Sequence, residues 1–279
     1  MNISQPAISQ HIHALEDYYG AKLFERSSKK VELTQAGYTL YQYAKEIMEL
    51  HRLAKRAVSD LVDLVTGRLT IGASFTIGEY VLPRLLAAFS RKYPDVKFSV
   101  TIGNTEFVRE RTRESGIDLG LVEGLVDDAQ LINEQFLVDE LILVVSKHHP
   151  LARVSSIGKQ EIADQLRNDT FIMREEGSGT RSTVDKVLQN LGIEPAHVIT
   201  LGSTQAIKEA VEVNLGVTML SKWTLNKELK LGSLKPVRIK DYDVTRGFYL
   251  IQHRDKFQSK ACAEFTRFLR EEKLISILR

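Results

Sequence analysis

The chain has 279 residues, of which 43% are hydrophobic and 27% charged, and this composition is that of a folded globular protein with one large or two to three small domains. Six prolines and the absence of a low-complexity tract argue against long disordered segments. The formal net charge of +2 neither indicates nor excludes nucleic-acid binding, and no apolar run is long enough to span a bilayer.

The N-terminal sequence and the cysteine content indicate the cellular compartment in which the protein is expected. The first residues contain no basic segment followed by an apolar one, so we expect no signal peptide and a cytoplasmic protein. The single cysteine, Cys262, cannot form an internal disulfide, which agrees with a reducing compartment. Cys262 lies in a helical-looking stretch and is interpreted as a packed, inert thiol.

The first predicted element is a short helix over residues 4–16. Ile8, Ile12 and Leu15 recur at helical spacing and form an apolar face. The other face carries short or amide side chains able to reach base edges in DNA, although a solvated helix face would have a similar composition. These side chains are those of Gln5, Ser9, Gln10 and His13.

Residues 23–33 predict a small hairpin, because two short apolar pieces flank the turn Ser27-Ser28-Lys29-Lys30. A basic tip suits contact with DNA phosphates, which positions a protein without reading sequence. A solvated turn is the alternative.

A long helix is predicted over residues 35–65, with Thr34 as its cap and Thr66-Gly67 as its end. Seven apolar residues follow one another at alternating spacings of four and three. Such a heptad-like stripe favours helix packing between subunits. The seven are Tyr43, Ile47, Leu50, Ala54, Ala57, Leu61 and Leu64.

Beyond residue 67 the pattern changes to alternating strands and helices. This alternation predicts open, largely parallel α/β sheets, and the length suffices for two small lobes. Strands are predicted over 68–73, 96–102, 117–122, 140–146, 170–173, 198–201, 218–220 and 248–252, and helices over 79–93, 106–114, 181–191, 204–214 and 260–271.

One family shares the N-terminal pattern. Residues 4–12 read Ser-Gln-Pro-Ala-Ile-Ser-Gln-His-Ile, and they are followed in order by Leu15-Glu16, Gly20, Leu23-Phe24-Glu25-Arg26, Val31, Leu33-Thr34 and Gly37. This ordered set resembles the LysR family of bacterial transcriptional regulators. The long helix and a two-lobed domain similar to periplasmic binding proteins also fit, so the resemblance covers essentially the whole chain.

The resemblance implies an α/β protein in three parts. These are a partial winged helix-turn-helix over 1–34, a linker helix for dimerisation over 35–66, and an effector-binding domain over 67–279. The last is expected to be discontinuous, with lobe I formed by 67–145 and 247–279 and lobe II by 146–246.

The resemblance also assigns the DNA contacts. The helix that begins Ser-Gln-Pro-Ala is the family's recognition helix, which would place Gln5, Pro6, Ser9, Gln10 and His13 toward the major groove. Arg26, Lys29 and Lys30 would lie on the wing and contact the backbone or minor groove.

One departure concerns the start of the chain. The family has two further helices before the recognition helix, and without them Ile8, Ile12 and Leu15 lose much of the surface they should bury, worth about 1.5–3 kcal/mol each. Either the start codon is misassigned, since members often have Leu where Met1 stands, or the chain is truncated with impaired DNA binding. We expect the first.

Three strand-to-helix turns are candidates for a sensing site, because ligands of open α/β sheets bind at carboxyl ends of strands and at helix N-termini. Their hydroxyls and backbone N–H groups suit an oxyanion, glycines permit close approach, and Arg181 supplies charge. Helix capping is the alternative at each turn. The resemblance implies an effector between the lobes, and the Gly-Ser-Gly-Thr-Arg segment looks like that of members that control sulfur or carbon assimilation.

We therefore expect a small anionic metabolite or inorganic oxyanion as effector. The residues expected to bind it are Ser74, Phe75, Thr76, Gly177, Ser178, Gly179, Thr180, Ser203 and Thr204. An anion that bridges two lobes favours one closure angle, and this would change the spacing of the DNA-binding domains.

Other functions are less well supported. The sequence has no metal-ligand cluster, nucleophile elbow or P-loop lysine, so we expect no enzyme, no catalytic residue, no metal and no cofactor. A transporter's solute-binding protein would share the two-lobed fold but not the long helix. An effector-binding, oligomerising regulator without competent DNA binding stays open. The expected partners are promoter DNA, if the full N-terminal domain is present, the effector, and a second copy in a dimer or tetramer, with no membrane.

Overall fold

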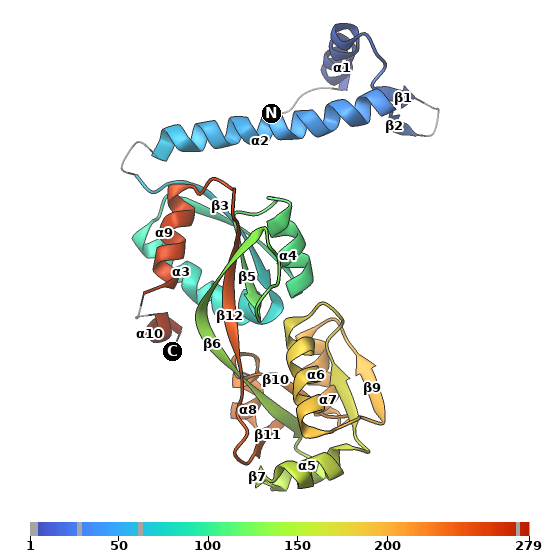
Figure 1. The fold of residues 1–279 in the computed structure, drawn as a ribbon, viewed down its shortest axis with the longest axis vertical. Coiled ribbons are helices and arrows are strands. Elements are labelled where there is room, and N and C mark those ends of the chain that lie inside the picture. Colours follow the sequence, from blue (N-terminus) through green and yellow to red (C-terminus); the bar gives the residue numbers. More distant parts are fainter. Residues whose placement is uncertain (1–4, 27–29, 61–63, 272–273, 279) are drawn as a thin grey trace. The chain divides into compact units, whose positions relative to one another are not determined.

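The computed structural model describes residues 5–26, 30–60, 64–271 and 274–278 (Figure 1). The chain divides into two compact units, residues 1–64 and residues 65–279. Within the described ranges, no helix is long and apolar enough to cross a membrane.

The first unit consists of α1 (Gln5–Tyr19), the strands β1 (Phe24–Arg26) and β2 (Val31–Leu33), and the long helix α2 (Gln35–Asp60). The two strands form an antiparallel hairpin, as the sequence predicts. Thr34 caps α2, because its hydroxyl accepts a hydrogen bond from the Gly37 N–H at 2.9 Å.

A buried carboxylate joins α1 to the segment before the hairpin. Glu16 accepts hydrogen bonds from the Lys22 ammonium and from the Leu23 N–H, each at 2.9 Å. The hydrogen bond from Lys22, followed by the one from Leu23, lowers the pKa of Glu16 to about 2. The carboxylate therefore stays charged at neutral pH and fixes where the chain turns after α1.

The long helix is shorter than predicted. Its described part ends at Asp60, and residues 64–66 are not helical. The apolar pattern that continued to Val65 was misleading, because Val65 packs against the hydrophobic core of the second unit. Burial in that core outweighs the local helical pattern.

The second unit contains ten strands and eight α-helices among its described residues. The strands are β3 (Gly67–Ser74), β4 (Val96–Gly103), β5 (Leu119–Glu123), β6 (Leu131–Ser146), β7 (Ser156–Ile157), β8 (Thr170–Met173), β9 (His197–Thr200), β10 (Thr218–Ser221), β11 (Leu234–Ile239) and β12 (Val244–His253). The helices are α3 (Leu82–Lys92), α4 (Thr105–Arg113), α5 (Lys159–Leu166), α6 (Gly179–Leu191), α7 (Thr204–Glu212), α8 (Asn226–Leu231), α9 (Lys260–Leu269) and α10 (Leu274–Leu278). A π-helical turn, Ile77–Val81, precedes α3.

The main sheet is mixed, so the expectation of largely parallel sheets is wrong for this sheet, whereas the small sheet of β8 and β9 is parallel. The order of the main sheet is β4-β3-β5-β12-β6-β11-β7, with β10 also paired to β6. β3 runs parallel to β4 and β5, whereas β12 runs antiparallel to β5 and β6, and β10 and β11 run antiparallel to β6. The antiparallel pairs arise because β6 and β12 are long strands that cross the unit in opposite directions (Figure 1).

Two lobes share these long strands. We call lobe I the part with β3–β5, α3, α4 and α9, and lobe II the part with β7–β11 and α5–α8. The largest core cluster contains Leu137 of β6 and Phe248 of β12 and belongs to lobe I, whereas Leu141 and Val244 of the same strands pack in a cluster of lobe II. Along each of these two strands, the chain therefore passes from one core to the other within a few residues.

Candidate functional site

The loop after β3 carries the first group of predicted site residues. Ser74 and Thr76 are buried and Phe75 is half-buried. The Thr76 N–H donates a hydrogen bond to Glu123 Oε1 at 3.0 Å. The Ser74 hydroxyl lies close enough to Glu123 to lower its pKa, yet it makes no well-aligned hydrogen bond in the described part of the chain. Of the two donors in this loop, the Thr76 N–H is hydrogen-bonded to Glu123 with good geometry and the Ser74 hydroxyl is not.

The Glu123 carboxylate occupies the centre of the site. Glu123 ends β5 and is only 3% exposed. Besides the Thr76 N–H, it accepts hydrogen bonds at Oε2 from the Thr180 hydroxyl and from Arg246 Nη1, both at 2.7 Å. Burial alone would raise the pKa of Glu123, but Arg246 and the hydroxyl and amide donors outweigh it and hold the pKa below its usual value. Donors from both lobes thus surround one negative charge.

Arg246 connects this carboxylate to a second one. Its Nε donates to Asp139 Oδ2 at 2.8 Å, and its Nη1 also donates to the Thr180 hydroxyl at 3.0 Å. Asp139 accepts a further hydrogen bond from the Ser221 hydroxyl at 2.6 Å. Burial raises the pKa of Asp139 in spite of Arg246. Because Asp139 lies on β6 and Arg246 on β12, the network sits where these strands pass between the cores.

Gly177 and Gly179, at the turn from β8 into α6, bring the backbone of lobe II close to the backbone of lobe I. The Gly177 carbonyl accepts a hydrogen bond from the Glu106 N–H of lobe I at 3.0 Å, and Gly177 has a φ of +79°, which favours glycine. A Cβ on Gly179 would lie 2.2 Å from the Glu123 carbonyl oxygen. Ser178 caps α6 through the Arg181 N–H. In this structure, the close backbone approach that the glycines permit therefore joins lobe II to lobe I.

A second buried arginine lies beside the site. Arg174 forms a bidentate ion pair with Glu175, at 2.7 Å for each hydrogen bond, and its guanidinium carbon lies 4.5 Å from the centre of the Phe75 ring. Its Nη1 also donates to the Thr204 hydroxyl at 3.4 Å. Arg174 thereby connects the loop after β3 with the N-terminus of α7.

Six of the predicted site residues fall into two groups. Thr76, Thr180, Thr204 and Phe75 contact the buried charges between the lobes, whereas Ser178 and the exposed Ser203 cap their helices. Sequence reasoning missed the charged residues Glu123, Asp139, Arg174 and Arg246. A signal existed for Glu123, which follows a predicted strand at its carboxyl end. Within the ranges that the structure describes, no group of His, Cys, Asp or Glu side chains could hold a metal.

The predicted DNA-contacting residues lie on α1 and the hairpin. Gln10 and His13 are exposed and Ser9 is half-buried, while Lys30 is exposed and pairs with Glu32 at 2.5 Å. Gln5 begins α1 and Arg26 ends β1. Lys29, and the side chains of Gln5, Pro6 and Arg26, lie outside the described part of the structure.

Two sequence families match the chain. The bacterial regulatory helix-turn-helix domain of the LysR family matches residues 1–38, and the LysR substrate binding domain matches residues 63–273. The chain belongs to the LysR family. It is therefore related to DNA-binding transcriptional regulators that carry an effector-binding domain, and both the helix α1 with the hairpin after it and the two-lobed fold agree with the resemblance of the sequence.

Relatives with names support this membership. The chain is 40% identical to the HTH-type transcriptional regulator CysL of Bacillus subtilis over 88% of this chain and 80% of CysL. It is 36% identical to a probable RuBisCO transcriptional regulator of Cyanidioschyzon merolae over 94% of this chain and 88% of the relative.

Solved structures give the same fold. The regulatory domain of Synechocystis CcmR, in complex with 2-PG, is 32% identical, has a TM-score of 0.67 and covers 74% of this chain and 96% of that domain. HinK, a LysR family transcriptional regulator from Pseudomonas aeruginosa, has a TM-score of 0.64 at 19% identity and covers 97% of this chain and 89% of HinK, which shows the fold alone.

Proposed function

We propose that this LysR-family regulator is controlled by a small anion bound between lobes I and II. The observation that carries the proposal is the environment of Glu123. The Thr76 N–H of lobe I and the Thr180 hydroxyl of lobe II donate to the same buried carboxylate. These donors favour a negative charge, and they come from both lobes.

In the structure, the protein's own carboxylate fills this position, so an effector anion has to compete with Glu123. Displacement of the Glu123 side chain would free the Thr76 N–H, the Thr180 hydroxyl and one Arg246 N–H. The Ser74 hydroxyl, which lies close to Glu123 without a well-aligned hydrogen bond, supplies a further donor. Exchange of an internal anion for an external one changes what holds the two lobes together, and it therefore shifts the population of closure angles.

The proposed effector is a small metabolite with a phosphate or carboxylate group, or an inorganic oxyanion. The CcmR regulatory domain, at 32% identity, was solved in complex with 2-PG. The proposed effector residues are those predicted from the sequence: Ser74, Phe75, Thr76, Gly177, Ser178, Gly179, Thr180, Ser203 and Thr204. The proposed lobe boundaries are 67–145 with 247–279 and 146–246.

The proposed output is a change in promoter binding by a self-associated regulator. Tyr43, Ile47 and Leu50 on α2 are exposed in the single chain, and their heptad-like spacing favours packing against a second copy. Gln10 and His13 are exposed on α1, where contact with base edges is expected, and His13 also lies 3.5 Å from the Glu16 carboxylate. Effector binding and DNA binding therefore reside in different units and require coupling through α2.

Titration calorimetry of the full chain with 2-phosphoglycolate, inorganic phosphate and sulfate tests the proposal. We expect at least one to bind, and Thr180→Val to weaken it by about tenfold or more, as loss of a hydrogen bond to a charged group implies. Glu123→Gln should strengthen binding, because the competing charge is gone. Thr200→Val, on an exposed position of β9, is the matched control. Absence of binding for all three anions, or equal effects of both threonine variants, would contradict the proposal.

A further inference from the structure

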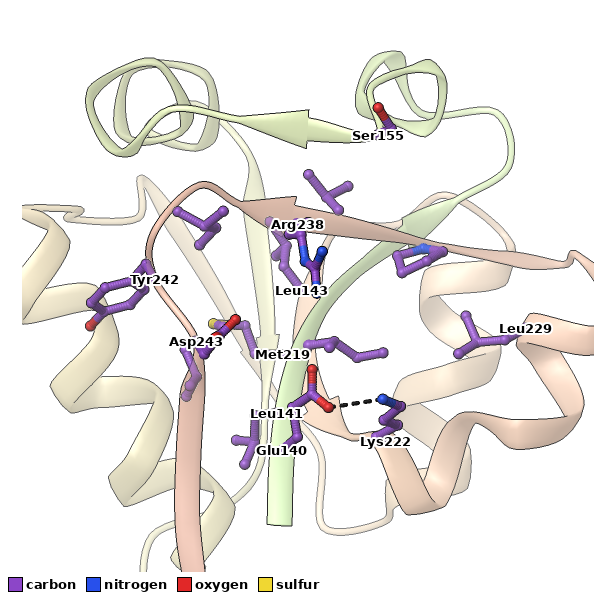
Figure 2. A pocket seen from close by; sticks show the side chains of 15 residues that line it. Glu140, Leu141, Leu143, Ser155, Met219, Lys222, Leu229, Arg238, Tyr242 and Asp243 are labelled. Carbon is purple, nitrogen blue, oxygen red and sulfur yellow. Dashed lines mark hydrogen bonds and ion pairs between the residues drawn. The ribbon is translucent and has the colours of Figure 1, made fainter. Parts of the chain in front are cut away.

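Lobe II contains a hollow, away from Glu123, at the place where β11 leaves β6. β11 pairs with β6 as far as Val237 opposite Leu143. The chain then leaves β6, so that Arg238 pairs with β7, and β12 resumes the pairing with Val244 opposite Leu141. Between these two points lies a hollow of about 370 Å³ (Figure 2). This volume falls in the range of small-molecule sites, roughly 300–1,000 Å³.

The walls of the hollow are apolar. Leu141 and Leu143 of β6, Met219 of β10 and Leu229 of α8 line it, together with Val237 of β11. These side chains come from three strands and a helix, and they form the apolar floor of a hollow that is open to solvent on one side. An alkyl or phenyl group fits this lining.

Charged residues stand at the mouth. Glu140 is neutralised by Lys222, with 2.9 Å between the carboxylate and the ammonium group. Arg238 is exposed, and Figure 2 shows its side chain extending from β11 into the opening. In the part of the chain that the structure describes, Arg238 forms no ion pair or side-chain hydrogen bond, and neither does Asp243 on the same rim. Arg238 is thus a cation with all its donors available beside an apolar hollow.

We propose that this hollow is a binding site for a small carboxylate with an apolar body. The guanidinium of Arg238 holds the carboxylate through paired N–H donors, and the apolar walls take the alkyl or phenyl group. A ligand that also carries an ammonium group gains a partner in Asp243. The site is separate from the anion position at Glu123 and does not depend on the function proposed above.

The place of the hollow gives it a regulatory consequence. Leu141 lies two residues from Asp139 on β6, and Val244 lies two residues from Arg246 on β12. These are the two strands whose charged residues form the network between the cores. A ligand that holds β6 and β12 in one arrangement therefore couples to the position at Glu123, and such coupling is reciprocal.

Titration calorimetry and ligand-observed NMR with the full chain test the site. The probes are hexanoate, 4-methylpentanoate and 3-phenylpropanoate, with 4-methylpentanamide as the uncharged control. We expect at least one carboxylate to bind at millimolar concentration or below, and the amide to bind more weakly. Arg238→Gln should weaken binding by about tenfold or more, whereas Lys240→Gln, which removes the same charge from an exposed position two residues on, should not. Tighter binding of L-leucine than of 4-methylpentanoate would show that Asp243 takes part.

Two further variants locate the site. Leu229→Trp should block binding by narrowing the hollow, and Thr200→Val should leave it unchanged because Thr200 is exposed on β9 and does not line the hollow. The proposal is overturned if none of the three carboxylates binds, if Arg238→Gln and Lys240→Gln bind them equally well, or if Leu229→Trp binds them as well as the wild type. Because Arg238 is exposed, its variant is expected to fold, and a melting temperature equal to that of the wild type verifies this.

Discussion

Replacement of Arg246 by methionine is the most informative perturbation of the second unit. Methionine retains much of the side-chain volume but removes the positive charge between Glu123 and Asp139. These carboxylates are 3% and 1% exposed, and Arg246 is the cation that both contact. The variant therefore leaves two negative charges buried with hydroxyl and amide donors but without a cation.

The expected loss of stability follows from the burial. Removal of one partner from a buried ion pair destabilises proteins by about 3–5 kcal/mol, because the remaining charge is not solvated. In a domain of this size, 1 kcal/mol corresponds to about 2–4 °C of melting temperature. We therefore expect Arg246→Met to lower the melting temperature of the second unit by about 6–20 °C at neutral pH.

Thermal denaturation followed by circular dichroism measures this loss, and its pH dependence identifies the cause. Without Arg246, burial raises the folded-state pKa of both carboxyls above their unfolded values, so protonation favours the folded state. The deficit relative to wild type should therefore be smaller at pH 5 than at pH 8. Addition of Glu123→Gln and Asp139→Asn should restore much of the stability, because neutral side chains replace the unpaired charges.

Arg267→Met is the control, since Arg267 is mostly exposed and pairs with Glu264 on the surface at 2.9 Å. An exposed pair contributes about 0–1 kcal/mol. The reasoning is refuted if Arg246→Met is as stable as Arg267→Met, or if its deficit does not change with pH.

Three other predictions concern packing, assembly and acid sensitivity. Gly179→Ala should destabilise the second unit by about 1–3 kcal/mol, since its Cβ would meet the Glu123 carbonyl oxygen, and denaturant titration measures the loss. Leu50→Glu should weaken self-association by placing a charge on the exposed stripe of α2, as measured by analytical ultracentrifugation. Glu16→Gln should weaken the attachment of α1 to the segment before the hairpin. In the wild type, the Glu16 contact is fully present above pH 4.5 and is lost as the pH falls toward about 2, because its folded pKa lies below the ordinary value; amide exchange at Leu23 follows it.

Each of these has a matched control. Gly158→Ala places a Cβ where nothing lies within 4 Å, so it should not destabilise. His51→Glu adds a charge to α2 beside the stripe and should leave assembly unchanged. Asp17→Asn alters an exposed neighbour of Glu16 and should not affect exchange at Leu23. A control that behaves like its test variant contradicts the corresponding prediction.

Local pattern was sufficient for much of the fold. The strand predicted over 170–173 is β8, and the cap at Thr34 and the hairpin that follows α1 are present. Such elements depend on side chains within a few positions of one another, which periodicity and capping chemistry report directly. The order of motif residues around α1 was likewise enough to indicate the LysR family.

Tertiary contacts decided the rest of the secondary structure. The first half of β6, residues 131–139, was missed because Glu134, Gln135 and Asp139 interrupt the apolar pattern. β11 was also missed, and it contains Pro236 and charged residues. These segments form strands because their neighbours in the sheet satisfy their backbone groups, and the neighbours come from distant parts of the sequence.

The same distinction applies to the site. The sequence alone was enough to place Thr76 and Thr180 at strand-to-helix turns, where donors for an anion are expected. It did not show that Glu123 accepts hydrogen bonds from both of these threonines. Nor did it relate Glu123 to Arg246, because the two are 123 positions apart and no local spacing connects them. Only the pairing of β5 and β6 with β12 brings the two together, and there the low solvent access makes their charges interact strongly.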